Sequence, residues 1–120
     1  MPARNDDLKA RLTRSREINI TVTGRKSGRA ISIPVWFVLE DDTLYLVPVQ
    51  GSDTQWYKNV LKNPSIGIKE GSAEAEVRAD PVKDATQVKS VVEKFRGKYG
   101  ASDVKKYYSK LDVAVLAHMR

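Results

Sequence analysis

The chain has 120 residues, and its 21 Lys and Arg outnumber its 15 Asp and Glu, which gives a formal net charge of +6. A chain of this length suits a single domain, residues 1–120, with a hydrophobic core of its own. It has no Cys and one His, His118, which excludes disulfides, thiolate nucleophiles and metal sites built from Cys or from two imidazoles. We expect no metal site, so the chemistry must come from carboxylates, Lys, Tyr or a bound cofactor.

Two further properties narrow the class of protein. The sequence shows no signal sequence and no apolar stretch long enough to cross a bilayer, so we expect a cytoplasmic protein without integral membrane association. The excess of positive charge favours anionic partners, such as a phosphorylated small molecule or nucleic acid.

The first half of the chain alternates polar and apolar residues, a pattern typical of β-strands with one buried face. After a short amphipathic helix at 6–13, the pattern predicts strands at 18–23, 31–39 and 43–49. The dipeptide Asp41-Asp42 indicates a turn between the last two of these strands. Apolar residues then recur four apart, which predicts a helix at 54–63 with Asp53 as its N-cap and Pro64 after its end.

The second half begins with two short predicted strands at 65–69 and 73–77, and Pro81 is expected to interrupt the extended chain. Asp84, with Gln87 three residues later, resembles a capping box and predicts the start of a helix that runs to Gly100. A helical fragment at 102–110 and a final strand at 113–118 complete the chain.

This order of elements, β-β-β-α-β-β-α-β, has mostly short connections, so we expect mostly antiparallel pairing. Strands of this kind close on themselves to protect their edges. The predicted fold class is therefore α+β, a six-stranded, mostly antiparallel β-barrel with two to three flanking helices.

The sequence GRKSGR, residues 24–29, lies between the first two predicted strands. Its glycines can adopt positive φ, so one interpretation is a hairpin loop with solvated cations. The other is an anion site, in which backbone N–H groups and the Ser27 hydroxyl donate hydrogen bonds. Three side chains would then add charge and forked hydrogen bonds: Arg25, Lys26 and Arg29. The P-loop pattern is absent.

Several aromatic residues also have two interpretations. Trp36 on a predicted strand and Trp56 on a predicted helix are either core residues or walls for a planar ring. Asn59, three residues after Trp56, either caps exposed backbone or hydrogen-bonds a ligand. Tyr107 and Tyr108 either pack at a helix end or line a pocket with phenols that polarise a carbonyl or nitro group.

Two segments together resemble a known family, VTGRKSGRAISIPVWFVLEDDTLYLVPVQG and QWYKNVLKNPSIGIKEGSAEAEVRAD. They are similar to the pattern T-x-G-R-K-[ST]-G, a strand containing Pro, and W-Y-x-N-L-x-A-N-P, in this order. That pattern belongs to the deazaflavin-dependent nitroreductase family of the FMN-binding split β-barrel superfamily. The resemblance covers residues 18–80 well and is weaker beyond, where LDVAVLAHMR resembles the closing strand of the family.

The resemblance implies a split barrel and an oxidoreductase that passes a hydride from the reduced deazaflavin coenzyme F-420 to a quinone, nitro compound or enone. It implies that the phosphate region of the coenzyme is held by Arg25, Lys26, Ser27 and Gly28, with Arg29 adding charge. Around the deazaflavin it implies Ile33, Pro34, Trp36, Val47, Pro48, Val49, Gln50, Trp56 and Asn59. Tyr107 and Tyr108 would face the substrate, and no residue is assigned a catalytic role.

A hydride-carrying cofactor accounts for a redox enzyme without Cys and with a single His, because the protein then supplies orientation, charge and exclusion of water. FMN is an alternative cofactor, since Ile31 and Gln50 stand where several family members have basic residues. A non-catalytic flavin, haem or lipid carrier on the same barrel is a second alternative, although His118 is expected to be structural.

A nucleic-acid partner is disfavoured, because the cations are spread along the chain and the strands show no cluster of exposed aromatic residues. The expected partner is a small-molecule hydride acceptor, and a homodimer is one possible assembly.

Overall fold

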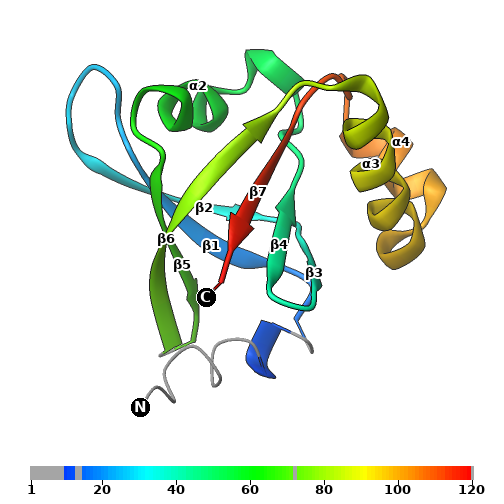
Figure 1. Cartoon of the computed structure of the whole chain (residues 1–120), viewed down its shortest axis with the longest axis horizontal. Helices are drawn as coiled ribbons and strands as arrows, with labels where there is room; N and C mark the ends of the chain where they lie inside the picture. The colour runs from blue at the N-terminus through cyan, green and yellow to red at the C-terminus, as the bar shows by residue number, and fades with distance from the viewer. Residues whose placement is uncertain (1–9, 13–14, 72, 120) are drawn as a thin grey trace.

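The computed structural model describes residues 10–12, 15–71 and 73–119, and in these ranges the strands form one curled sheet of seven (Figure 1). They are β1 (Ile18–Thr23), β2 (Ala30–Val35), β3 (Val38–Glu40), β4 (Thr43–Leu46), β5 (Ser65–Glu70), β6 (Ala73–Val82) and β7 (Ala114–His118). Their order across the sheet is β2-β1-β5-β6-β7-β4-β3, and every neighbouring pair is antiparallel. The α+β class and the antiparallel barrel are therefore confirmed, with one strand more than predicted among the described residues.

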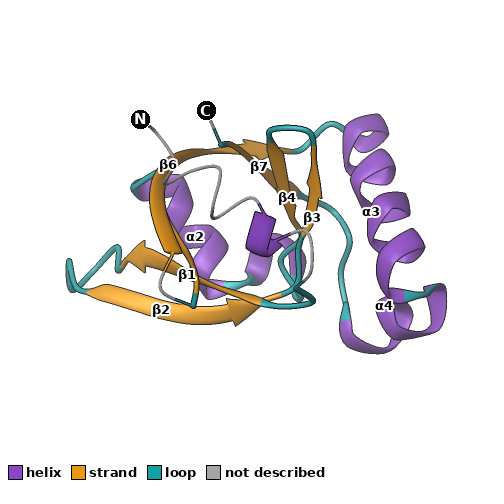
Figure 2. Ribbon diagram, turned by 90° about the horizontal axis from the view of Figure 1, so that it is seen from below, coloured by secondary structure: helices purple, strands orange, loops and turns teal. Residues whose placement is uncertain are grey.

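The additional strand arises because the strand predicted at 31–39 is broken at Trp36 and Phe37 into β2 and β3. β2 pairs with β1 and β3 pairs with β4, so the two halves lie at opposite edges of the sheet. The prediction of one continuous strand is wrong, because an apolar sequence does not reveal where the backbone bends. The bend carries the chain from one edge to the other and closes the curl into a split barrel (Figure 2).

Two other strand predictions are also corrected. β6 runs through Pro81 to Val82, whereas its end was predicted at residue 77. The strand pairs with β5 as far as Arg78 and with β7 from Ala79 onward, so tertiary pairing outweighs the missing N–H of the proline. β4 ends at Leu46 rather than residue 49, before the tight turn in which the Gly51 N–H donates to the Pro48 carbonyl.

The helices in the described ranges are η1 (Gly51–Asp53, a 3₁₀ turn), α2 (Gln55–Lys62), α3 (Ala85–Tyr99) and α4 (Ala101–Tyr107). The predicted cap of α3 is confirmed, since the Asp84 carboxylate accepts a hydrogen bond from the Gln87 N–H at 3.0 Å. The predicted N-cap Asp53 is wrong: it belongs to η1, and Thr54 occupies the N-cap position of α2. Of the helix predicted at 6–13, only residues 10–12 are described, and these are helical.

Two hydrophobic clusters hold the elements together. The alternation predicted for β1 is confirmed, because Ile18, Ile20 and Val22 are all buried inside the barrel. α2 covers one end of the barrel and adds Trp56, Tyr57 and Val60 to the same core, since its apolar residues share one face. α3 and α4 pack against the outside of the barrel around a second cluster (Figure 1).

In the part of the chain that the structure describes, no helix has the length and apolar character that crossing a bilayer requires.

Candidate functional site

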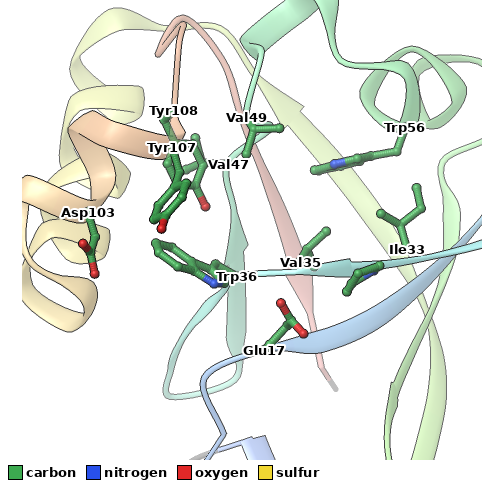
Figure 3. Close-up of a pocket in the computed structure, with 11 residues that line it drawn as sticks. Glu17, Ile33, Val35, Trp36, Val47, Val49, Trp56, Asp103, Tyr107 and Tyr108 are labelled. Carbon is green, nitrogen blue, oxygen red and sulfur yellow. The ribbon is translucent and has the colours of Figure 1, made fainter.

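A cavity of about 430 Å³ opens beside β2, between the segment that follows β4 and helices α2 and α4 (Figure 3). Its volume lies in the usual range for small-molecule sites. We call it the aromatic cavity, because two indole rings and two phenol rings contribute to its wall. It is lined by Glu17, Ile33, Pro34, Val35, Trp36, Val47, Val49, Trp56, Asp103, Tyr107 and Tyr108.

The aromatic cavity brings together many of the residues proposed from the sequence. Eight of them line it: Ile33, Pro34, Trp36, Val47, Val49, Trp56, Tyr107 and Tyr108. The other eight do not line it: Arg25, Lys26, Ser27, Gly28, Arg29, Pro48, Gln50 and Asn59. The first set forms an apolar cavity that suits a flat ring. The second set is mostly polar and includes the basic loop, residues 24–29.

Three lining residues were not proposed from the sequence. Val35 follows Pro34 in an extended strand, where successive side chains normally point to opposite faces. The strand ends at Val35, and the bend that follows allows neighbouring residues to line one cavity. Glu17 and Asp103 lie in no recognisable motif, and no local signal could have identified them.

Tyr99 holds the bend that forms one wall of the aromatic cavity. Its ring stacks on Trp36, with centroids 4.2 Å apart and planes 9° apart. Its hydroxyl accepts a hydrogen bond from the Phe37 N–H at 3.0 Å and lies 2.7 Å from the Arg16 carbonyl and 2.8 Å from the Phe37 carbonyl. Burial raises the pKa of Tyr99, so the phenol keeps its proton and can donate to a carbonyl. The Trp36 wall therefore has a fixed position.

The phenol of Tyr108 belongs to the cavity wall, and its residue is buried at 6% exposure. Burial raises the pKa of Tyr108, with a smaller contribution from Tyr99. The group is therefore a neutral hydrogen-bond donor at physiological pH.

Lys98 supports the same bend from outside the cavity. Its Nζ donates to the Phe37 carbonyl at 2.9 Å and lies 3.6 Å from the centroid of the Phe37 ring. Burial lowers the pKa of Lys98 to about 8, and the nearby Arg16 adds to the effect. The carbonyl and the ring favour the charged form, but the loss of water outweighs them.

The low pKa of Lys98 predicts an unusual pH dependence of stability. Between about pH 8 and the ordinary Lys pKa of 10.5, Lys98 is protonated to a greater extent in the unfolded chain than in the folded protein. The free energy of unfolding should therefore rise with pH across this window relative to a Lys98→Met variant. Urea unfolding of both proteins at pH 7.5, 8.5 and 9.5 measures the difference. Parallel curves for the two proteins would contradict the assignment.

The basic loop, residues 24–29, lies beside α2 and is itself well ordered by backbone hydrogen bonds. The Gly24 N–H donates to the Arg29 carbonyl at 2.8 Å, and the Gly28 N–H donates to the Gly24 carbonyl at 2.9 Å. Gly28 has φ +73°, a conformation that strongly favours glycine. The Ser27 hydroxyl accepts from the Arg29 N–H at 3.2 Å, so it orders the loop while its own O–H can still donate.

Arg25 joins the basic loop to the helix that carries Trp56. Its guanidinium donates to the Asn59 Oδ1 at 2.8 Å and to the Gln55 Oε1 at 2.8 Å, and its backbone N–H also donates to the Asn59 Oδ1. Asn59 is 5% exposed, so this buried amide holds the loop rather than lining the cavity. The loop is thereby fixed next to the Trp56 end of the aromatic cavity.

The Lys26 and Arg29 side chains differ from Arg25 because both are exposed. Among the described residues, neither side chain has a hydrogen-bond or ion-pair partner. The loop therefore presents two cations that are available to an external anion.

His118 lies away from the aromatic cavity at the end of β7. Its Nε2 is 3.7 Å from the Asp80 carboxylate, and its side chain is largely exposed. It does not line the cavity, so it offers no axial ligand to a group bound there.

Comparison with solved structures shows the fold. The chain matches the "Structure of F420-H2 Dependent Reductase (FDR-A)" with a TM-score of 0.67 and 20% identity, over 86% of this chain and 94% of that one. A structure described as an F420 Reductase matches with a TM-score of 0.62 and 18% identity, over 92% and 90%. HutZ, the heme storage protein from Vibrio cholerae, matches with a TM-score of 0.69 and 13% identity, over 94% and 87%. The same fold therefore occurs in proteins described as reductases and in one described as a heme storage protein.

No curated protein matches the sequence significantly. A family model described as "F420H(2)-dependent quinone reductase" matches residues 4–117, which is nearly the whole chain. The match covers the basic loop, the bend at Trp36, α2 and α4, the elements that surround the aromatic cavity. The chain belongs to the F420H(2)-dependent quinone reductase family.

Proposed function

We propose that this protein is an oxidoreductase that transfers a hydride from the reduced deazaflavin coenzyme F-420 to a small organic acceptor: a quinone, a nitro compound or an enone. Family membership supports the coenzyme. The observation that carries the proposal is an apolar, aromatic cavity of about 430 Å³ next to a loop with two exposed cations. This combination suits a flat ring that is joined to an anionic tail.

The basic loop is the part that would hold the anionic tail. Lys26 and Arg29 supply charge, and the Ser27 hydroxyl and the loop N–H groups supply hydrogen bonds. From Arg29 to Ile33, the first lining residue of β2, the extended chain covers four residues, or about 13 Å. A ring carried on a phosphorylated sugar-alcohol chain can span such a separation.

The aromatic cavity would hold the ring. Trp36 and Trp56 offer flat apolar surfaces, and Val47 and Val49 add further apolar surface to the wall. When bound, the reduced coenzyme supplies the hydride, and the protein contributes orientation and a dry environment. Tyr108, kept neutral by burial, can donate a hydrogen bond to an acceptor oxygen on which negative charge develops.

The test is a titration of the protein with coenzyme F-420 and, separately, with FMN, followed by tryptophan fluorescence and by absorbance. Binding of coenzyme F-420 in the micromolar range, tighter than that of FMN, is the expected result. Steady-state oxidation of the reduced coenzyme by menadione and by a nitroaromatic compound then distinguishes an enzyme from a carrier. The proposal fails if coenzyme F-420 does not bind below about millimolar, and the enzymatic part fails if it binds without turnover.

A further inference from the structure

The aromatic cavity has a charge pattern that the proposed reaction does not explain. Two of its lining residues, Glu17 and Asp103, are carboxylates, and among the described residues no Lys or Arg lines it. The chain as a whole carries a net charge of +6, so cations would be expected by chance. In the described part of the chain, neither carboxylate has an ion-pair or hydrogen-bond partner.

The two carboxylates flank the Trp36 end of the cavity, with Glu17 below β2 near the middle of the cavity and Asp103 beyond Tyr107 (Figure 3). Ile18 pairs with Val35 across β1 and β2, so Glu17 comes next to the bend at Trp36. Asp103 lies four residues before Tyr107, and residues four apart share one face of a helix. Figure 3 shows Trp36, Tyr107 and Asp103 grouped at one end of the cavity, with Trp56 and Ile33 at the other.

The opposite end of the cavity adjoins the basic loop, since Arg25 is hydrogen-bonded to α2 next to Trp56. Negative charge and positive charge are therefore separated along the length of one site. An anionic tail is favoured at the Trp56 end, and a positive group is favoured at the Trp36 end.

Three cations of the described residues lie near the Trp36 end, and none of the three lines the cavity. Arg16 lies 5.1 Å from the centroid of the Tyr99 ring, Lys98 lies 3.6 Å from that of the Phe37 ring, and Lys106 lies 5.3 Å from that of the Tyr107 ring. Each is placed over a ring, and none lines the site. These three cations weaken the negative electrostatic potential at long range. Glu17 and Asp103 remain the charged groups that face a bound ligand.

The rings at the Trp36 end can add to the attraction. Trp36 lines the cavity while Tyr99 stacks on one of its faces and Tyr108 contacts it at 6.0 Å between centroids. Tyr107 meets Trp36 edge-on at 5.6 Å between centroids and is 52% exposed. The faces of electron-rich rings attract cations, most strongly where water is excluded.

We propose that the part of the aromatic cavity lined by Trp36, Tyr107, Glu17 and Asp103 binds flat organic cations, and that the acceptors reduced by this protein include positively charged ones. The inference rests on the proposed function for its redox part, but the binding part stands without it. It adds ring systems with a fixed or delocalised positive charge to the quinones, nitro compounds and enones of the proposed function.

The reduction of such an acceptor requires no reactant other than the reduced coenzyme. A hydride carries two electrons and one proton from the reduced coenzyme to an electron-poor ring atom of the cation. One bond to hydrogen forms on the acceptor as one breaks on the donor, the coenzyme releases its second hydrogen to solvent as a proton, and the positive charge of the acceptor is lost. The product is neutral, so its attraction to the two carboxylates disappears and release is favoured.

Three tricyclic probes of similar shape and different charge test the binding part: N-methylphenazinium (cation), phenazine (neutral) and phenazine-1-carboxylate (anion). Equilibrium dialysis of the protein without coenzyme gives the dissociation constant of each. The cation should bind about five- to tenfold more tightly than neutral phenazine, and the anion most weakly. Raising the salt concentration should reduce the preference for the cation.

A Glu17→Gln/Asp103→Asn double variant should lose this preference to within about twofold, while its affinity for phenazine stays unchanged. The matched control is Glu74→Gln/Glu76→Gln, which removes the same charge from exposed positions of β6 and should keep the preference. Equal affinity for all three probes in the wild-type protein would overturn the proposal. A cation preference that survives the Glu17/Asp103 double variant would also overturn it.

Turnover gives a second readout. With the reduced coenzyme, kcat/KM for N-methylphenazinium relative to menadione should fall about five- to tenfold in the Glu17/Asp103 variant. If coenzyme F-420 fails to bind while the cation preference is present, the proposed function is wrong and the binding site stands. If the coenzyme binds and the cation preference is absent, the proposed function stands and the inference about charge is wrong.

Discussion

Replacing Tyr99 with Phe is expected to lower the free energy of unfolding by about 2–4 kcal/mol, although the change removes one oxygen atom. The hydroxyl is bonded to three backbone groups, the Phe37 N–H, the Phe37 carbonyl and the Arg16 carbonyl. Lys98 still donates to the Phe37 carbonyl in the variant, so the buried Phe37 N–H and the half-buried Arg16 carbonyl lose their partner. A buried polar group without a partner costs about 1–3 kcal/mol. Urea unfolding monitored by circular dichroism measures the loss.

Tyr107→Phe is the matched control, because the same atom is removed from a residue that is 52% exposed. No hydrogen bond of its hydroxyl is present among the described residues, so the change should stay within about 0.5 kcal/mol. Near-ultraviolet circular dichroism should also change in the Tyr99 variant, because its ring stacks on Trp36. Equal and small losses in the two variants would show that Tyr99 does not hold the bend.

The second large effect is expected in coenzyme binding. A Lys26→Ala/Arg29→Ala variant should bind coenzyme F-420 about 100-fold more weakly, since two charge-assisted contacts of about 1.5 kcal/mol each are lost. The fold should be unaffected, because both side chains are exposed and neither has a partner among the described residues. Fluorescence titration gives the affinity, and a thermal melt gives the stability.

The control for this variant is Lys89→Ala/Lys105→Ala, which removes two charges from exposed positions of α3 and α4. It should leave coenzyme affinity within about twofold of wild type at physiological salt, where charges farther apart than about 8 Å are largely screened. Arg25 is unsuitable for the test, because its bonds to Gln55 and Asn59 link coenzyme binding to the position of α2. Equal weakening in both double variants would mean that net charge, rather than the basic loop, attracts the coenzyme.

Two features that depend on neighbours in sequence were predicted correctly. The burial of Ile18, Ile20 and Val22 follows from their period of two. The cap of α3 at Asp84 follows from a bond to Gln87, three residues away. In both cases the interacting groups lie within one turn or one strand, so the sequence contains all the information.

The bend at Trp36 and Phe37 was not predicted, because the groups that hold it are distant in sequence. The Phe37 N–H is bonded to the hydroxyl of Tyr99, which is 62 residues away. The local sequence favours extended chain on both sides of the bend. Only the packing of α3 against the barrel supplies the partner that holds the turned backbone in place.

The residues that line the aromatic cavity also include some that the sequence identified and some that it did not. Trp36, Trp56 and Tyr107 were proposed from their residue type and from the resemblance to a family, and they line one cavity. Glu17 and Asp103 resemble ordinary surface carboxylates in the sequence, and nothing near them marks a site.

By itself, the sequence determined the order and type of most strands and helices, the position of the basic loop, and the absence of thiol and paired-imidazole chemistry. These are properties of residue type and short-range spacing. The tertiary structure alone decided where the barrel closes and which charges face the aromatic cavity. Glu17 reaches the cavity through the pairing of β1 with β2, and Asp103 reaches it through the packing of α4 on α3, because both depend on contacts between segments that are far apart along the chain.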